Sequence, residues 1–461
     1  MFSFLFLPCG VKRETHSSGR NRKLSKAMES IDHKIEIIST AVGRRLEFVH
    51  PLSDQRCIYR VPKRLHQLNE KAYTPQLVSI GPLHHGKQEL QAMEDYKSRY
   101  LQQFLQLVNL SVGTCIKLIM ESEVKLRNYY AETILLSSED FVNMILLDAS
   151  FLIMLVLKHY LVDLRGSDDA IFNRPWMVTE INYDLLLLEN QLPFFILEDL
   201  LKLTDYLARH EGLSMIKLLH EYSKQWWPLW VKEDALGKKD FSDVKHIVDF
   251  LSIYHRPSQL PSPKNCKQIS LPSVTELHQT GVKFKLSSSK NFFDINFRNG
   301  ILEIPLLIID DRTEIFLRNL HAFEQCHCSP CDRYLSQCTI LMAKLFNAAK
   351  DVELLARTGI INNCLVDNEA LSTLFRDLVR GLCVGKIYFS DLEEELNKYY
   401  RSPWHRRKAN LKQNYFNSPW AGISVFAATI LLTFSIIQAV CSILQVKQGY
   451  RLKWNLDFYD H

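Results

Sequence analysis

Two adjacent histidines, His84 and His85, lie between glycines in the segment SIGPLHHGK. Imidazoles titrate near neutral pH and bind transition metals, so this pair is the most enzyme-like feature of the chain. Gly81, Pro82 and Gly86 also suit a tight turn, in which the imidazoles would cap the backbone. No acidic or cysteine partner is evident nearby in the sequence, so we favour the turn. Catalysis by the His84/His85 region remains the alternative.

A second set of polar residues, Asp184, Glu189 and Asn190, interrupts the apolar segment DLLLLENQLPFFILEDLL at residues 184–201. On a helix, the first two side chains would point about 140° apart, which argues against a pair of catalytic carboxylates. Buried polar groups need hydrogen-bond partners. We therefore expect a helical segment whose polar residues form a buried network with neighbouring elements, and which kinks or breaks at Pro193.

The densest group of potential metal ligands lies in the segment QCHCSPCDRYLSQC, at Cys326, His327, Cys328, Cys331 and Cys338. Thiolates are suitable ligands for tetrahedral zinc. The spacing differs from that of a standard zinc knuckle, however, and every ligand would come from one loop and the next helix. We expect an adaptable surface loop with incidental cysteines, and zinc binding is the alternative.

The usual signatures of catalysis are absent from the sequence. It contains no phosphate-binding loop, dinucleotide-binding fingerprint, HExxH zinc motif or nucleophile elbow. We therefore expect no catalytic residue, no cofactor and no bound metal, and we do not expect the protein to be an enzyme.

A long uncharged segment near the C-terminus, residues 413–446, predicts a membrane anchor. Its central part, residues 419–444, reads PWAGISVFAATILLTFSIIQAVCSIL. A helix needs roughly 20 apolar residues to cross a hydrocarbon core about 30 Å thick. We predict a single transmembrane helix within this segment, followed by a short tail at residues 447–461. A buried hairpin of core helices is the alternative, although globular helices rarely run this long without a charge.

The charges that flank the anchor predict its orientation. Residues 401–412 contain five basic residues and no acid, whereas the basic residues of the tail are partly balanced by Asp457 and Asp460. Positive residues close to a span favour the cytoplasmic side. We expect a cytosolic body and an extracytosolic tail, in the plasma membrane or the endoplasmic reticulum.

The composition is that of a folded protein, with 461 residues, 23% charged and 47% hydrophobic. The net charge of +5 is concentrated near the N-terminus and beside the anchor, which does not indicate nucleic-acid binding. Eleven cysteines, mostly isolated, indicate reduced thiols in the cytosol. Residues 1–27 lack the basic start of a signal peptide and are predicted to be a disordered basic extension, with a plastid transit peptide as the alternative.

The body, residues 28–412, is predicted to be mainly α, with a small β element. Apolar residues at helical spacing predict a helix over residues 93–108. Ser137 and Asp140 suit the start of a buried helix over residues 141–161, which is apolar almost all round. A membrane span there is the alternative, but Asp148 near its centre would oppose insertion. We therefore expect Asp148 to be satisfied within the core.

The second half of the body contains the predicted β element. A Pro- and Ser-rich segment at residues 256–273 predicts a linker or long surface loop. Alternating and β-branched residues at 281–284 and 292–305 predict strands, with a hairpin turn at Asn299 and Gly300. Helices are expected again from Thr313 to about residue 400.

Several blocks of this sequence resemble a known plant family. VPKRLHQLNEKAYTPQLVSIGPLHHG, FVNMILLDASFL, DLLLLENQLPFFIL, LPSVTELHQTGVKFK, FRNGILEIPLLIIDD, RNLHAFEQC and PWAGISVFAATILLTFSIIQ are similar, in this order, to blocks of the family named domain of unknown function 247. The resemblance covers residues 31–444 and implies a transmembrane protein with no established reaction, cofactor or catalytic residue. Some grass members are linked to recognition in self-incompatibility. The resemblance thus implies signalling or binding to an unknown protein partner.

Overall fold

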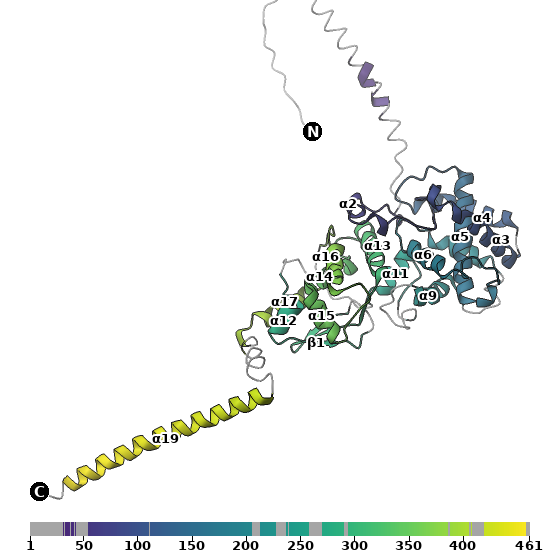
Figure 1. Ribbon diagram of the computed structural model, residues 1–461. Helices are drawn as coiled ribbons and strands as arrows, with labels where there is room; N and C mark the ends of the chain where they lie inside the picture. Colours follow the sequence, from purple (N-terminus) through teal and green to yellow (C-terminus); the bar gives the residue numbers. More distant parts are fainter. Residues whose placement is uncertain are drawn as a thin grey trace, which may run out of the picture. The chain divides into compact units, whose positions relative to one another are not determined.

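The computed structural model describes residues 31, 33–36, 38–40, 42, 54–109, 111–204, 213–226, 237, 239–257, 270–289, 294–385, 388–404, 407 and 419–457 (Figure 1). The chain divides into two units, Met1–Asp54 and Gln55–His461. In the first unit, the described residues between 31 and 42 are helical and exposed. The predicted extension at residues 1–27 and most of the predicted loop at residues 256–273 lie outside the described residues.

Helix α5 (Ser138–Tyr160) is the centre of the first group of helices in the second unit. Ser137 caps this helix by accepting a 3.1 Å hydrogen bond from the backbone of Asp140, as the sequence predicted. Because α5 is apolar almost all round, neighbouring elements cover most of its surface, and its predicted burial is confirmed. The helices that pack against it are α3 (Ala92–Val108), α4 (Val112–Asn128), α7 (Phe194–Lys202) and α9 (Met215–Trp226) (Figure 1).

The single acid in the middle of α5 is satisfied inside the core, as predicted. Oδ1 of Asp148 lies 2.6 Å from Nζ of Lys97, which comes from α3. Its Oδ2 accepts a 2.8 Å hydrogen bond from the backbone N–H of Gly81. A buried carboxylate needs such partners, because the desolvation of an unpaired charge is costly.

The segment at residues 184–193 is not the continuous helix that we predicted. Helix α6 (Pro175–Leu185) ends near its start, and α7 begins only after Pro193, which is the N-cap residue. The side chain of Gln191 explains part of this ending, since its Nε2 donates to the carbonyls of Leu185 and Leu187 at 2.9 and 2.8 Å. The helix therefore breaks before the proline, and the chain between α6 and α7 is irregular but buried.

Short helical elements complete this region. They are α2 (Lys63–His66), η1 (Glu70–Ala72), η2 (Gln88–Leu90) and η3 (Val162–Leu164). A second group of helices follows, as expected for residues up to about 400. It consists of α11 (Ile247–His255), α12 (Val274–Gln279), α13 (Asp311–His327), α14 (Tyr334–Leu345), α15 (Ala349–Arg357), α16 (Asn368–Leu378) and α17 (Ser390–Arg401). Apolar side chains from both groups form one hydrophobic core, and the fold is mainly α, as predicted.

Two small sheets lie in the second half of the body. In the first, β3 (Ile301–Ile304) pairs parallel with β1 (Lys283–Leu286) and antiparallel with β2 (Asn296–Arg298). Asn299 and Gly300 connect β2 to β3 with φ values of 52° and 76°, so the predicted hairpin is confirmed. In the second sheet, β4 (Leu307–Ile309) pairs parallel with β5 (Ile361–Asn363).

Helix α19 (Pro419–Asp457) contains the predicted anchor. Residues Phe426–Gln448 are long and apolar enough to cross a membrane, and none of this apolar window is buried in the protein. Helix α5 has a similar length and composition, but 83% of its apolar window is buried. The backbone of α19 remains helical beyond residue 446, so the first part of the predicted tail continues the helix.

Candidate functional site

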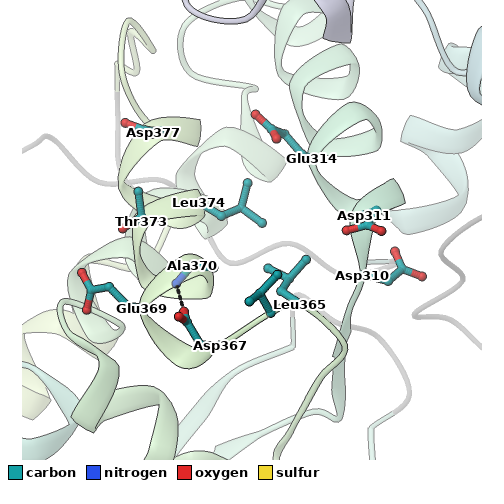
Figure 2. A pocket seen from close by; sticks show the side chains of 11 residues that line it. Asp310, Asp311, Glu314, Leu365, Asp367, Glu369, Ala370, Thr373, Leu374 and Asp377 are labelled. Carbon is teal, nitrogen blue, oxygen red and sulfur yellow. Dashed lines mark hydrogen bonds between the residues drawn. The ribbon is translucent and has the colours of Figure 1, made fainter.

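Two strand–helix connections form an open groove on the body. Strand β4 leads into α13 through Asp310, and β5 leads toward α16 through the loop that ends at Asp367. Both aspartates are N-cap residues, which accept hydrogen bonds from Arg312 N at 3.1 Å and Ala370 N at 2.7 Å. Because β4 and β5 are parallel neighbours, the two helices begin at the same edge of the sheet. The groove between them has a volume of about 730 Å³ (Figure 2).

The walls of the groove combine apolar side chains with carboxylates. The apolar part consists of Leu365, Val366, Ala370 and Leu374. Val366 is 97% exposed, although leucine and valine side chains are usually buried. The acidic part comes from both helices and the connecting loop, as Figure 2 shows, and comprises Asp310, Asp311, Glu314, Asp367, Glu369 and Asp377.

Four arginines pair with four of these carboxylates. The distances are 2.5 Å for Arg312–Asp310, 2.7 Å for Arg318–Glu314, 3.1 Å for Arg376–Glu369 and 3.4 Å for Arg380–Asp377. None of these arginines lines the groove. Arg312 instead lines a separate cavity of about 200 Å³ beside α6, and Arg318 is buried. The groove thus presents carboxylates to solvent, while the neutralising cations lie outside its walls.

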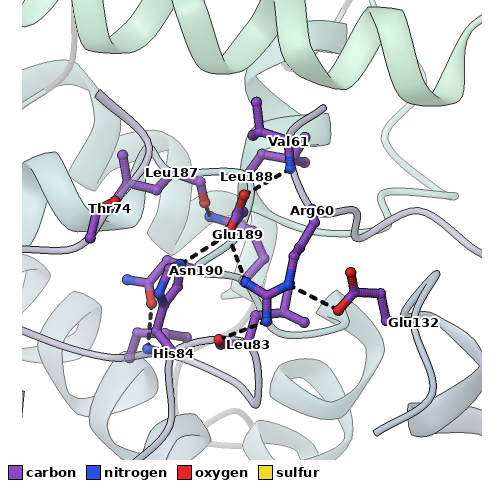
Figure 3. Close-up of polar contacts among 12 residues, drawn as sticks. Arg60, Val61, Thr74, Leu83, His84, Glu132, Leu187, Leu188, Glu189 and Asn190 are labelled. Atoms are coloured by element: carbon purple, nitrogen blue, oxygen red, sulfur yellow. Dashed lines mark hydrogen bonds and ion pairs between the residues drawn. The ribbon is translucent and has the colours of Figure 1, made fainter. Parts of the chain in front are cut away.

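The histidine turn that we singled out in the sequence forms a different site, centred on Glu189 (Figure 3). Oε1 of Glu189 accepts a 2.8 Å hydrogen bond from the backbone N–H of Val61. Its Oε2 lies 3.2 Å from Nη1 of Arg60 and 3.2 Å from Nε2 of His84, the latter outside hydrogen-bond geometry. Nε of Arg60 also forms an ion pair with Glu132, at a distance of 2.9 Å. The acidic partner of His84 is thus distant in sequence.

Burial determines the charge states in this cluster. Both His84 and Glu189 are buried, whereas Arg60 is half-exposed. Burial lowers the pKa of His84, against the opposing effect of Glu189, so the imidazole is neutral at pH 7. Burial would raise the pKa of Glu189, but His84 and the Val61 N–H outweigh this effect and hold the pKa below its usual range. No hydrogen bond or ion pair among the described residues joins His85 to these side chains.

Asp184 and Asn190 extend the cluster into the predicted buried network. Asp184 accepts hydrogen bonds of 2.7–2.8 Å from three consecutive backbone N–H groups, those of residues 76–78, and burial raises its pKa to about 7. Oδ1 of Asn190 accepts a 2.7 Å bond from Ile80 N, and its Nδ2 donates to Val78 O at 3.0 Å. Through these hydrogen bonds, the side chains hold the backbone of residues 61–84 against the helical core. The network thus has a structural role. Gly81 and Gly86 have the positive φ values of a tight turn, as expected, but His84 does not cap the backbone as predicted, because neither ring nitrogen has a hydrogen-bond partner among the described residues.

Among the described residues, no three potential ligands of the cysteine segment are placed to hold a metal ion. Cys326 lies in the last turn of α13 and Cys338 is buried within α14, so only Cys328 and Cys331 lie on the surface loop that we expected. Burial raises the pKa of Cys326 to about 11 and that of Cys328 to about 12. Both thiols are therefore protonated at neutral pH when no metal is bound.

We expect purified protein to contain no stoichiometric zinc by elemental analysis. The double substitution Cys328→Ser and Cys331→Ser should leave the Tm nearly unchanged, because a structural zinc would contribute directly to folding. Cys338→Ser is the matched control and should destabilise the fold by about 1–3 kcal/mol, since its hydroxyl would enter the apolar core. One equivalent of zinc that is lost in the double variant would contradict this expectation.

Sequence reasoning missed the groove, although a local signal exists. Asp310 and Asp367 each follow a short β segment and precede a helix, in LIIDDRTE and INNCLVDNEA. Either residue alone predicts only a helix N-cap. The parallel pairing of β4 with β5 brings them to one edge, and the sequence does not reveal this pairing.

Comparison with known proteins places the chain in a family. A "UPF0481 protein At3g47200" of Arabidopsis thaliana is 28% identical over 424 residues, covering 84% of this chain and 86% of that protein. A "Putative UPF0481 protein At3g02645" of the same plant is 24% identical over 527 residues, with coverages of 94% and 96%. No solved structure matches the chain. The family model described as "Plant protein of unknown function" matches residues 58–434. The chain therefore belongs to this plant family, domain of unknown function 247, as its sequence blocks predicted.

Proposed function

We propose that this chain is a membrane-anchored, non-enzymatic protein whose helical body binds another protein through the groove between α13 and α16. The observation that carries the proposal is the combination of a 730 Å³ open groove with an almost fully exposed Val366 at its wall. Apolar surface that lines a groove and is bordered by polar residues is typical of interaction sites. A partner that covers Val366 would remove this apolar surface from water.

An enzyme that uses the His84/His85 region is the alternative, and accessibility argues against it. A general base must come within hydrogen-bond reach of a substrate proton. His84 is buried, and neither of the two cavities described above is lined by His84 or His85. The bonds around Glu189 and Asn190 support the backbone, which favours a structural role for this cluster over catalysis.

The proposed location is a membrane that α19 crosses once, with the body in the cytosol. The window Phe426–Gln448 supports the crossing by its length and apolar composition. The basic residues at 401–412 support the orientation, because positive charge near a span favours the cytoplasmic side.

Glycosylation tests this orientation. Asn109-Leu110-Ser111 is the N-x-Ser/Thr acceptor of the body, and Asn109 is an exposed residue at the end of α3. We expect Asn109 to stay unmodified in plant cells, because the cytosol lacks the glycosylation machinery. An acceptor placed on an extended tail after Asp460 should be modified, giving a shift on gels that a glycosidase removes. A modified Asn109 together with an unmodified tail would place the body on the opposite side.

Proximity labelling in plant cells tests partner binding. A labelling enzyme fused to the body should mark a set of neighbours for the unaltered protein and lose part of that set after Val366→Lys. The matched control is Val124→Lys, since Val124 is also an exposed valine, 76% exposed, but lies on α4. Neighbour sets that are identical for the unaltered protein and both variants would contradict binding through the groove.

A further inference from the structure

The charge of the groove restricts what can enter it. Of its lining carboxylates, Asp311 and Asp367 form no ion pair with any described residue, and the arginines that pair with the others lie outside the walls. The N-termini of α13 and α16 carry partial positive charge that offsets only part of this negative charge. A phosphate or another anion would meet the unpaired carboxylates of Asp311 and Asp367, and the lining residues include no basic side chain. The favoured ligand group is therefore cationic.

The apolar wall restricts the ligand further. Leu365 and Leu374 are half-buried against the core, and Val366 extends this apolar surface into solvent. A small hydrated cation would gain nothing from these side chains. Lysine and arginine bury their aliphatic stems along apolar surfaces while the charged end stays near polar groups. A volume of about 730 Å³ is sufficient for several side chains of an extended segment.

We infer that the groove between α13 and α16 binds a peptide segment of the partner protein in which a lysine or arginine adjoins an apolar residue. This inference rests on the proposed function and specifies the chemistry of the partner. The basic group lies near Asp311 and Asp367, and the apolar neighbour covers Val366. Electrostatic attraction between exposed groups weakens with salt, so binding falls as ionic strength rises.

Selection from a displayed random peptide library tests the inference, with the full chain in detergent micelles as the target. Selected peptides should be enriched in Lys or Arg beside Leu, Ile, Val or Phe. Fluorescence anisotropy of the selected peptides should then show affinity that falls about tenfold with Asp311→Lys, because like charges repel across an interface. Val366→Lys should weaken binding similarly, and its side chain is too exposed for the change to disturb folding.

Glu121→Lys is the matched control, since Glu121 is an exposed helical acid on α4, and this variant should bind the peptides as the unaltered chain does. Selected peptides without basic residues, peptides unaffected by both groove substitutions, or a failure to select any peptide would overturn the inference. If proximity labelling still depended on Val366 in that case, the groove would bind a protein of different chemistry and the proposed function would stand. If both experiments failed, the proposed function would fall as well.

Discussion

Replacing Lys97 by methionine is expected to lower the free energy of unfolding by about 3–5 kcal/mol, because it leaves a buried carboxylate without its counter-charge. Lys97 is fully buried, and its Nζ lies 2.6 Å from Asp148 and 2.6 Å from Glu94. Burial raises the pKa of Asp148 and the ammonium of Lys97 opposes this effect, so the lysine is needed to keep the acid charged. Urea denaturation followed by circular dichroism measures the loss.

Two further variants separate the pair from general damage to the core. Combining Lys97→Met with Asp148→Asn should recover much of the lost stability, since the amide is neutral and still accepts the N–H of Gly81. Lys117→Met removes an exposed ion pair with Glu121 and should change stability by less than about 1 kcal/mol. If Lys97→Met and Lys117→Met lowered the free energy of unfolding equally, the buried ion pair would contribute no more to stability than the exposed one.

The same pair shows what the sequence could predict. The apolar surface of residues 141–161 and the capping pattern at Ser137 predicted a buried helix, and Asp148 then required a partner. The identity of that partner was not predictable, because Lys97 lies on α3 and reaches α5 only through helix packing. Local signals determine where a helix starts and which surface it buries, whereas partners depend on tertiary contacts.

The segment after α6 shows where local reasoning fails. Four leucines and two acids at residues 184–190 suit a helix by composition, and tertiary contacts overrode that propensity. Asp184 and Asn190 instead bind backbone groups of residues 76–80, which requires an irregular chain at Asn190. The predictions of a buried network and of a break at Pro193 were correct, whereas the helix predicted for the residues before Pro193 was wrong.

The groove could not be predicted from the sequence, because it also depends on tertiary contacts. Each carboxylate on α13 and α16 has a local explanation as a cap, a first-turn acid or part of a helical ion pair. Only the pairing of β4 with β5 makes them face one cavity. The exposure of Val366 is likewise a property of the folded loop, since an isolated valine in sequence predicts burial.

Two described helices, α5 and α19, are candidates for contact with lipid. Both have the length and composition of a span, but α5 is enclosed by other helices and carries the buried Asp148. Side chains of α19 such as Phe434 and Ile443 are 65% and 67% exposed. Such an apolar surface in water is unfavourable, and each Leu, Ile, Phe or Val contributes about 0.3–0.6 kcal/mol to membrane insertion. Of the two candidate spans, α19 is therefore the one that we propose as the anchor.

Deleting residues 419–444 is accordingly expected to move the body from the membrane fraction to the soluble fraction. Replacing the same residues with a run of leucines should keep the protein in the membrane, because the anchor acts through length and apolarity rather than through specific side chains. Ultracentrifugation of cell extracts after a high-salt wash measures both outcomes, since salt removes proteins held only by surface charge. A truncated protein that still sediments would show that another part of the chain binds membrane.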